Sequence, residues 1–194
     1  MKTVTGLFDN YEAAKDAVAR LENAGFPSDD ISIVSHHRDD DSESNAGSGA
    51  GVGAGLGAAV GGAGGLLTGL GFMAIPGVGP VVAAGWLAAT LTGAVGGAVV
   101  GGVAGGLIGA LTESGVSEED AHLYAEGVRR GGSLVTARVA DERVSEADAI
   151  LAGANPVDIN ARRKLYVQEG WQRFDANADP YTEEEIERER SRYL

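Results

Sequence analysis

The chain has 194 residues, a formal net charge of −13, 31 glycines and no cysteine. So acidic a chain repels polyanions at long range, which disfavours nucleic-acid partners, and the lack of cysteine excludes thiol catalysis, disulfides and cysteine-ligated zinc. The length allows one domain plus a substantial insertion, and we expect no cofactor.

Residues 1–37 predict the first half of a small α+β domain. Residues that favour strands alternate over 3–8, and Asp9 or Asn10 can cap a helix that begins near Tyr11. A second strand is predicted over 31–35. The N-terminus has a basic residue and a short apolar stretch followed by an acid, which is not the form of a signal peptide. We therefore expect this half to face the cytoplasm.

A glycine-rich insertion follows. Residues 38–46 form an acidic linker, and residues 47–112 contain no charged side chain. Glycine recurs there at every fourth position in two series, and residues four apart share one face of a helix, where the missing side chains let a second helix approach. We predict an antiparallel glycine-zipper helical hairpin, with helices over 47–74 and 80–112 and a turn over 75–80. The predicted turn residues are Pro76, Gly77, Gly79 and Pro80, and the predicted packing residues are Gly49, Gly53, Gly57, Gly61, Gly65, Gly69, Gly85, Gly93, Gly97, Gly101, Gly105 and Gly109.

Two environments are open for this hairpin. Its outer faces carry leucine and valine that a single hairpin cannot bury, and helices about 42 and 50 Å long exceed the roughly 30 Å hydrocarbon core of a bilayer. The flanks are acidic and lack the cations that anchor a span to the cytoplasmic side. The hairpin is expected either to enter lipid, with both ends on the cytoplasmic side, or to pack in a soluble assembly.

Residues 113–160 predict one further helix and the second half of the domain. Ser117 and the acids after it favour a helix start, and a strand over 134–139, a short helix over 145–152 and a fourth strand over 157–159 come next. Without the insertion the order is β-α-β, β-α-β, which predicts a ferredoxin-like split β-α-β domain. The predicted fold class is α+β, with the hairpin and one extra helix inserted between the second and third strands.

Residues 161–194 form a charged tail that contains aromatic residues. Thr182 and Glu185 have the spacing of a capping box and predict a last helix of mixed charge. Aromatic residues in a polar tail need a surface to cover, so we expect them to dock on their own domain or on a neighbouring subunit. The predicted docking residues are Tyr166, Trp171, Phe174 and Tyr181.

Catalytic and metal-binding patterns are weak in this sequence. The histidines at 36–37 and the acids at 39–41 are interpreted as a solvated linker rather than as metal ligands, and His122 as a surface residue of a helix. Arg129 and Arg130 are interpreted as cations that complement a helix dipole. No phosphate-binding loop, nucleophile elbow or zinc-protease motif occurs. We therefore expect no enzymatic activity and no metal.

Three segments together are typical of a known family. They are TVTGLFDNYEAAKDAVARLENAGFPSDDISIVS, AIPGVGPVVAAG and YAEGVRRGGSLVTARV, and they make roughly residues 1–160 resemble the bacterial general stress proteins related to heat-induced and low-temperature-induced glycine-zipper proteins. The resemblance implies a stress-associated, membrane-associated protein without enzymatic activity. The tail from Arg162 resembles an extension of some members only.

The expected function is self-assembly through the glycine-zipper hairpin in a stress-associated, membrane-associated protein, with itself and the lipid bilayer as partners. One alternative is a soluble homo-oligomeric shell or ring in the cytoplasm, with the hairpins packed protein against protein. A second alternative is a ferredoxin-like module that senses a small ligand, which requires a pocket. No nucleic acid and no small-molecule substrate is expected as a partner.

Overall fold

The computed structural model describes residues 1–36, 70–96 and 106–193. The acidic linker and most of the predicted packing glycines, namely those at 49–69 and at 97, 101 and 105, lie outside these ranges. The expectations for those residues therefore stay predictions.

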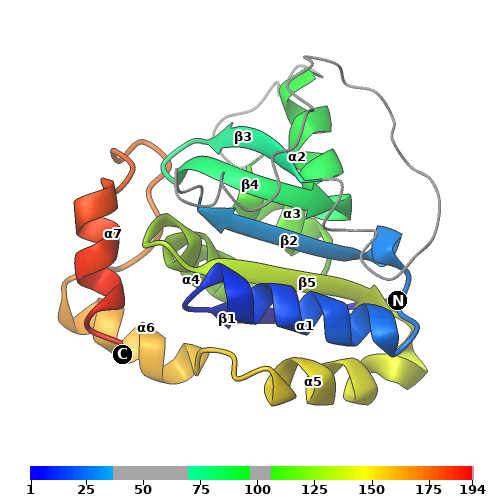
Figure 1. Cartoon of the computed structure of the whole chain (residues 1–194). Helices are drawn as coiled ribbons and strands as arrows, with labels where there is room; N and C mark the ends of the chain where they lie inside the picture. Colours follow the sequence, from blue (N-terminus) through cyan, green and yellow to red (C-terminus); the bar gives the residue numbers. More distant parts are fainter. Residues whose placement is uncertain (37–69, 97–105, 194) are drawn as a thin grey trace.

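The described chain is an α+β protein built on one five-stranded antiparallel sheet (Figure 1). The strand order is β1-β5-β2-β4-β3. The hydrogen-bonded register sets Thr5 opposite Thr136, Ile33 opposite Val135, and Val34 opposite Ala83. The strands span β1 Lys2–Phe8, β2 Ile31–His36, β3 Gly71–Ile75, β4 Gly79–Gly85 and β5 Ser133–Val139.

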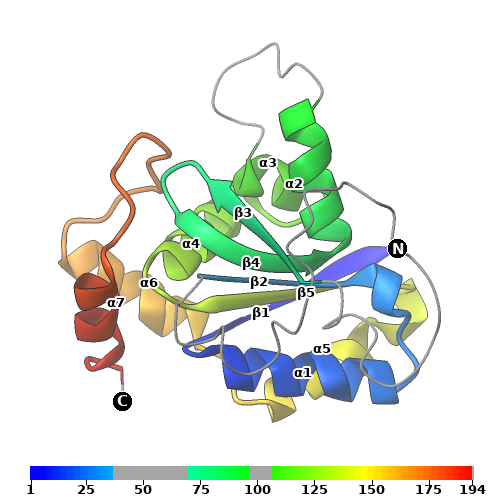
Figure 2. The same cartoon turned by 45° about the horizontal axis from the view of Figure 1, so that its top comes forward.

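Helices α1 (Tyr11–Asn23) and α5 (Val144–Gly153) cover one face of the sheet (Figure 2). Helix α1 begins where predicted because the Asn10 side chain accepts a hydrogen bond of 2.8 Å from the Ala13 backbone N–H. Four of its apolar residues recur at helical spacing and are buried, namely Ala14, Ala17, Val18 and Leu21. They pack with Phe8, Ile33 and Val135 in the first core cluster, which consists of buried residues from β1, β2, β5, α1 and α5.

Helices α2 (Trp86–Gly96), α3 (Leu107–Glu113) and α4 (Glu118–Arg129) cover the other face (Figure 2). Because strand side chains alternate, Leu7 and Val34 point to this face while Phe8 and Ile33 point to the first. Helix α4 starts at the predicted Ser117 cap, whose Oγ accepts from the Asp120 backbone N–H at 3.1 Å. Two short 3₁₀ turns, Ser28–Asp30 and Asp141–Arg143, complete the connections.

The predicted helices are wrong over 71–74 and 80–85, where the chain forms a β-hairpin. The turn falls within the predicted 75–80, but it joins strands β3 and β4 instead of two helices, and β4 pairs with β2. Helix α2 begins only at Trp86. Gly85 has a φ of +85°, and a Cβ there would overlap the Ile31 carbonyl oxygen. Glycine at this position therefore lets the backbone of β4 lie close to that of β2, and it does not lie in a helix groove.

The predicted fourth strand over 157–159 is also wrong. Val157 donates one backbone hydrogen bond of 2.7 Å to Leu7 O at the edge of β1, but the pairing goes no further. Asp158 instead caps helix α6 (Ile159–Gln168), accepting from the backbone N–H groups of Asn160 and Ala161 at 2.9 and 3.0 Å. The carboxylate cap therefore turns the chain into a helix where the sequence pattern favoured a strand.

The tail forms α6 and a final helix, α7 (Glu183–Arg190), beside the C-terminal end of α4 (Figure 1). The predicted capping box opens α7, since Thr182 and Glu185 exchange hydrogen bonds in both directions. None of the helices within 1–36, 70–96 and 106–193 combines the length and the apolar character that crossing a membrane requires.

Candidate functional site

The tail aromatics lie against the scaffold of their own chain. Tyr166 is fully buried, and Trp171 meets its ring edge-on with the centroids 5.9 Å apart. Phe174 joins the second core cluster, which consists of buried residues from the sheet and from α2–α4. The guanidinium of Arg129 lies 4.9 Å from the Tyr181 ring, a favourable cation–π distance. All four predicted docking residues are thus in contact with one another or with the domain.

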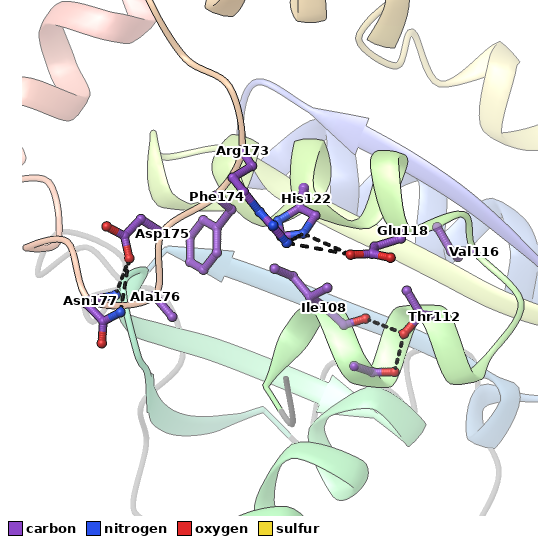
Figure 3. A pocket seen from close by; sticks show the side chains of 11 residues that line it. Ile108, Thr112, Val116, Glu118, His122, Arg173, Phe174, Asp175, Ala176 and Asn177 are labelled. Carbon is purple, nitrogen blue, oxygen red and sulfur yellow. Dashed lines mark hydrogen bonds and ion pairs between the residues drawn. The ribbon is translucent and has the colours of Figure 1, made fainter. Parts of the chain in front are cut away.

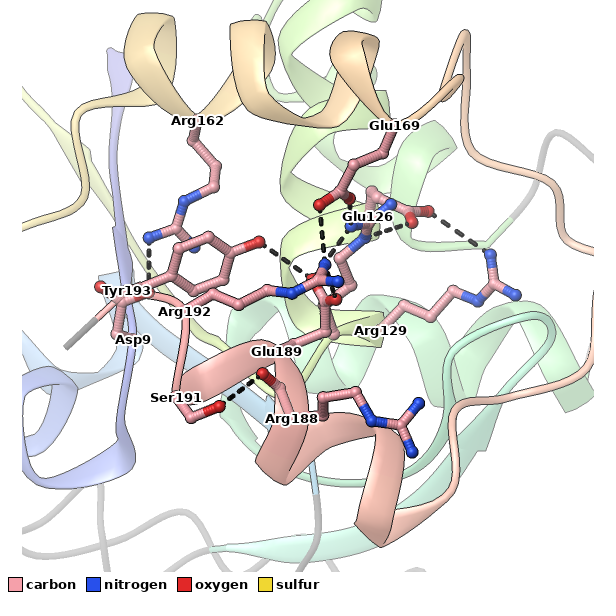
Figure 4. A network of polar contacts seen from close by, with 11 residues as sticks. Asp9, Glu126, Arg129, Arg162, Glu169, Arg188, Glu189, Ser191, Arg192 and Tyr193 are labelled. Carbon is pink, nitrogen blue, oxygen red and sulfur yellow. Dashed lines mark hydrogen bonds and ion pairs between the residues drawn. The ribbon is translucent and has the colours of Figure 1, made fainter.

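A cluster centred on Arg130 holds the tail to α4, and Figure 4 labels its three carboxylates, Glu126, Glu169 and Glu189. The Arg130 guanidinium donates to Glu126 at 2.8 Å, to Glu169 of the tail at 2.6 Å and to Glu189 of α7 at 3.0 Å. The same guanidinium lies 4.0 Å from the centre of the Tyr166 ring. Burial by itself lowers the pKa of Arg130, but the hydrogen bonds to the carboxylates outweigh it and the pKa is raised. We call these five side chains the Arg130 cluster.

A second set of contacts extends this cluster to the end of β1 (Figure 4). Arg162 donates to Asp9 at 2.7 Å, and its guanidinium lies 3.6 Å from the centre of the Tyr193 ring. The Tyr193 hydroxyl donates to Glu189 at 2.9 Å. Burial raises the pKa of Tyr193 above its ordinary value, and Tyr166 and Glu189 add to the effect. The end of β1 and the C-terminal tail are therefore joined by charge-assisted contacts.

The sequence interpretation of Arg129 and Arg130 as dipole-complementing cations missed this cluster. Both do lie at the C-terminal end of α4, but the Arg130 side chain is only 7% exposed and its partners come from three elements. The acids that are far from Arg130 in the sequence show no sequence pattern that would pair them with this arginine. An alternation of acids and bases in α7 was the only sequence signal of the network.

The tail also packs closely against the β3–β4 turn. Gly77 has a φ of +75°, and a Cβ placed there would lie 2.6 Å from the Asp175 carbonyl oxygen. At Gly79 a Cβ would lie 2.8 Å from the Pro180 side chain. Two of the four predicted turn residues therefore need glycine, because the tail backbone passes close to Gly77 and the Pro180 side chain lies close to Gly79. The tail segment 174–180 thereby covers the turn that separates the two glycine series.

A pocket of about 790 Å³ lies between α3, the start of α4 and the tail (Figure 3). Ile108 and Thr112 line it from α3, and Phe174 lines it from the tail. His122 and Glu118, one turn apart on α4, form its polar end together with Arg173. The pocket therefore has an apolar wall and a charged end.

His122 is buried, so its interpretation as a surface histidine is wrong. Its Nε2 lies 2.8 Å from Arg173 Nη2, and because a guanidinium can only donate, Nε2 accepts and the proton sits on Nδ1. Nδ1 is buried and has no hydrogen-bond partner within the part of the chain that is described. Burial, followed by the charge of Arg173, lowers the pKa of His122, while Glu118 opposes the shift. The imidazole is therefore neutral near pH 7.

The predicted packing of the two glycine series against each other stays a prediction, because the whole first series, 49–69, lies outside the described residues. Gly85 ends β4, Gly93 lies in α2 and Gly109 lies in α3. Helices α2 and α3 pack against each other and against the sheet. Across the described ranges, no three histidine, cysteine or acidic side chains are grouped so as to hold a metal ion.

The N-terminal part of the chain matches a known family model. Residues 3–74 match the model described as "Heat induced stress protein YflT domain". Residues 3–74 are thus similar to a YflT domain. The predicted resemblance to heat-induced stress proteins is confirmed over these residues. The YflT range holds β1, α1, β2 and most of β3, but β5 and β4, which the sheet places around β2, lie beyond it. No curated protein and no solved structure matches the chain.

Proposed function

We propose that this YflT-domain protein acts in stress without catalysing a reaction, by associating with copies of itself through its glycine-rich residues. The observation that carries the proposal is the regular four-residue spacing of glycine in an uncharged stretch. Glycine costs about 1 kcal/mol relative to alanine inside an exposed helix, so a series of such residues is best explained by close helix packing that offsets this cost.

The close packing of the tail against the β3–β4 turn supports this proposal. The turn lies between the two glycine series, and residues 174–180 hold it against the scaffold at Gly77 and Gly79. A scaffold that fixes the midpoint of the glycine-rich region would limit how its two halves can be presented to another copy. We infer that the α+β domain and its tail hold the glycine-rich residues in position for association with another copy.

Two environments for the assembly follow from the sequence. In one, the glycine-rich residues associate at a lipid bilayer and the domain faces the cytoplasm. In the other, they pack protein against protein in a soluble shell or ring. Cell fractionation, followed by size measurement with and without detergent, separates the two: pelleting with membranes favours the first, and a large particle in the detergent-free supernatant favours the second.

The self-association itself is tested by filling the groove. Gly61→Leu combined with Gly97→Leu should place side chains on both glycine rows, and we expect at least a tenfold rise in the concentration at which the assembly dissociates, measured by light scattering after gel filtration. The matched control is Ala63→Leu with Val99→Leu, since positions two residues away lie on nearly the opposite face of a helix. The proposal is refuted if the parent chain is monomeric, or if the glycine and control variants dissociate alike.

A further inference from the structure

We propose that the pocket between α3, α4 and the tail binds a small monocarboxylate with an apolar body. This site is separate from the glycine-rich residues, so it stands or falls independently of the proposed self-association. The carboxylate would meet Arg173 at the charged end, and the hydrocarbon part would lie along the wall formed by Ile108, Val116 and Phe174.

The size and wall of the pocket suit such a ligand. Its volume of about 790 Å³ lies in the range of roughly 300 to 1,000 Å³ that small-molecule sites occupy. Ile108 and Val116 pack against the second core cluster, and Phe174, which completes the wall, is itself part of that cluster. Figure 3 shows the Phe174 ring facing Ile108 across the space. An alkyl or aryl group would therefore meet apolar atoms from both sides.

Arg173 is the cation that fits a carboxylate here. One of its N–H groups donates to His122 Nε2 at 2.8 Å, and 68% of its side chain is exposed, which leaves further donors for a ligand. A guanidinium presents its donors in a planar fork that matches the two oxygens of a carboxylate. Neutral His122 is buried, and its Nδ1–H has no hydrogen-bond partner among the described residues, so it positions that fork rather than competing with it in charge.

The acids of the pocket do not block this assignment. Glu118 lies 3.6 Å from Arg173 but is 72% exposed, and such exposed ion pairs are weak in water, so a ligand carboxylate can take its place. Asp175 lies at the other end of the pocket, turned toward Asn177, whose backbone N–H it accepts at 2.9 Å (Figure 3). The charged end near His122 therefore keeps a cation available for an anionic ligand.

Isothermal titration of the full chain with sodium octanoate tests the proposal. We expect saturable binding of one octanoate per chain, and at least tenfold weaker binding of acetate, which lacks the apolar body, and of octylamine, which lacks the carboxylate. Arg173→Gln should weaken octanoate binding at least tenfold. Arg20→Gln, which removes a similarly exposed arginine from α1, should leave it unchanged.

A second variant keeps the test decisive if Arg173→Gln disturbs the tail. Thr112→Glu places a negative charge on the α3 wall and should also weaken octanoate binding at least tenfold, with circular dichroism confirming that both variants are folded. The proposal is overturned if octanoate shows no saturable binding at millimolar concentration. It is equally overturned if octylamine binds as tightly, or if both folded variants bind like the parent chain.

Discussion

Replacing Arg130 by methionine should strongly destabilise the folded chain. The guanidinium is held between Glu126, Glu169 and Glu189, and it stacks on Tyr166. Methionine fills a similar volume but cannot donate, so it would leave the carboxylates of Glu126 and Glu189 buried and without the guanidinium that they share. An uncompensated buried charge is far more costly than the loss of an exposed ion pair.

The expected cost follows from the contacts that remain. Removing one partner of a buried ion pair typically costs about 3–5 kcal/mol. Here Glu126 keeps Arg129 at 3.6 Å, and Glu189 keeps Arg192 at 2.7 Å. These residual partners favour the lower part of the range, so we expect a loss of about 3 kcal/mol in the free energy of unfolding. For a chain of this size that corresponds to a fall of roughly 6–12 °C in the melting temperature.

Urea unfolding followed by tryptophan fluorescence, together with calorimetry, measures this loss. Arg20→Met is the matched control, because Arg20 pairs with Asp16 at half exposure, and exposed pairs contribute about 0–1 kcal/mol. Adding Glu126→Gln and Glu189→Gln to Arg130→Met should recover about half of the loss, since neutral amides are less costly to bury. The reasoning is refuted if Arg130→Met costs under about 1 kcal/mol, or no more than Arg20→Met.

Two further predictions follow from His122 and from the glycine turn. The pKa of His122 in the folded chain lies below its ordinary value of 6.5, so as pH falls the unfolded chain takes up the proton before the folded chain does. Neutral His122 therefore contributes stability that is fully present above pH 6.5 and is lost as pH falls toward the folded pKa. The free energy of unfolding should fall between about pH 7 and pH 5.5 in urea titrations, and His122→Gln should reduce that slope, whereas an unchanged slope would contradict the assignment. Gly77→Ala should cost at least about 1 kcal/mol more than Gly25→Ala, because both have positive φ but only Gly77 faces Asp175 O at close range. Equal unfolding midpoints for these two variants would show that the tail does not pack closely against the β3–β4 turn.

Local signals predicted the elements whose stability is local. Helix α1 begins beside a capping side chain and buries its apolar stripe, and α4 begins at Ser117 with acids in its first turn. The capping box of α7 was likewise readable from Thr182 and Glu185. In each case the determining contacts lie within about four residues of one another, which a sequence displays directly.

The strand β4 shows where this reading failed. Residues 80–85 were expected in a helix, because glycine spacing lies on both sides of them. In the structure they pair with β2, so that Val34 lies opposite Ala83 and His36 opposite Val81. Local preference is divided there, since Ala83 and Ala84 favour a helix whereas Val81 and Val82 favour a strand. Pairing with β2, almost fifty residues away in sequence, therefore decided the outcome.

The candidate site could be predicted only in part. The aromatic composition of the tail indicated docking, and Tyr166 and Phe174 are indeed buried. The pocket and the Arg130 cluster were not foreseeable, because His122 and Arg173 are 51 positions apart, and Arg130 and Glu189 are 59. Nothing in a helix pattern tells which surface a distant tail will cover.

The sequence by itself determined an α+β chain with its first strands, its capped helices and its stress-family resemblance, because hydrophobic period and capping act over a few residues. The tertiary structure alone decided that Gly77 and Gly79 serve a tail-covered strand turn, and that His122 and Arg130 are buried. Those outcomes depend on pairing and desolvation between segments far apart in the chain, and only the folded arrangement brings such segments together.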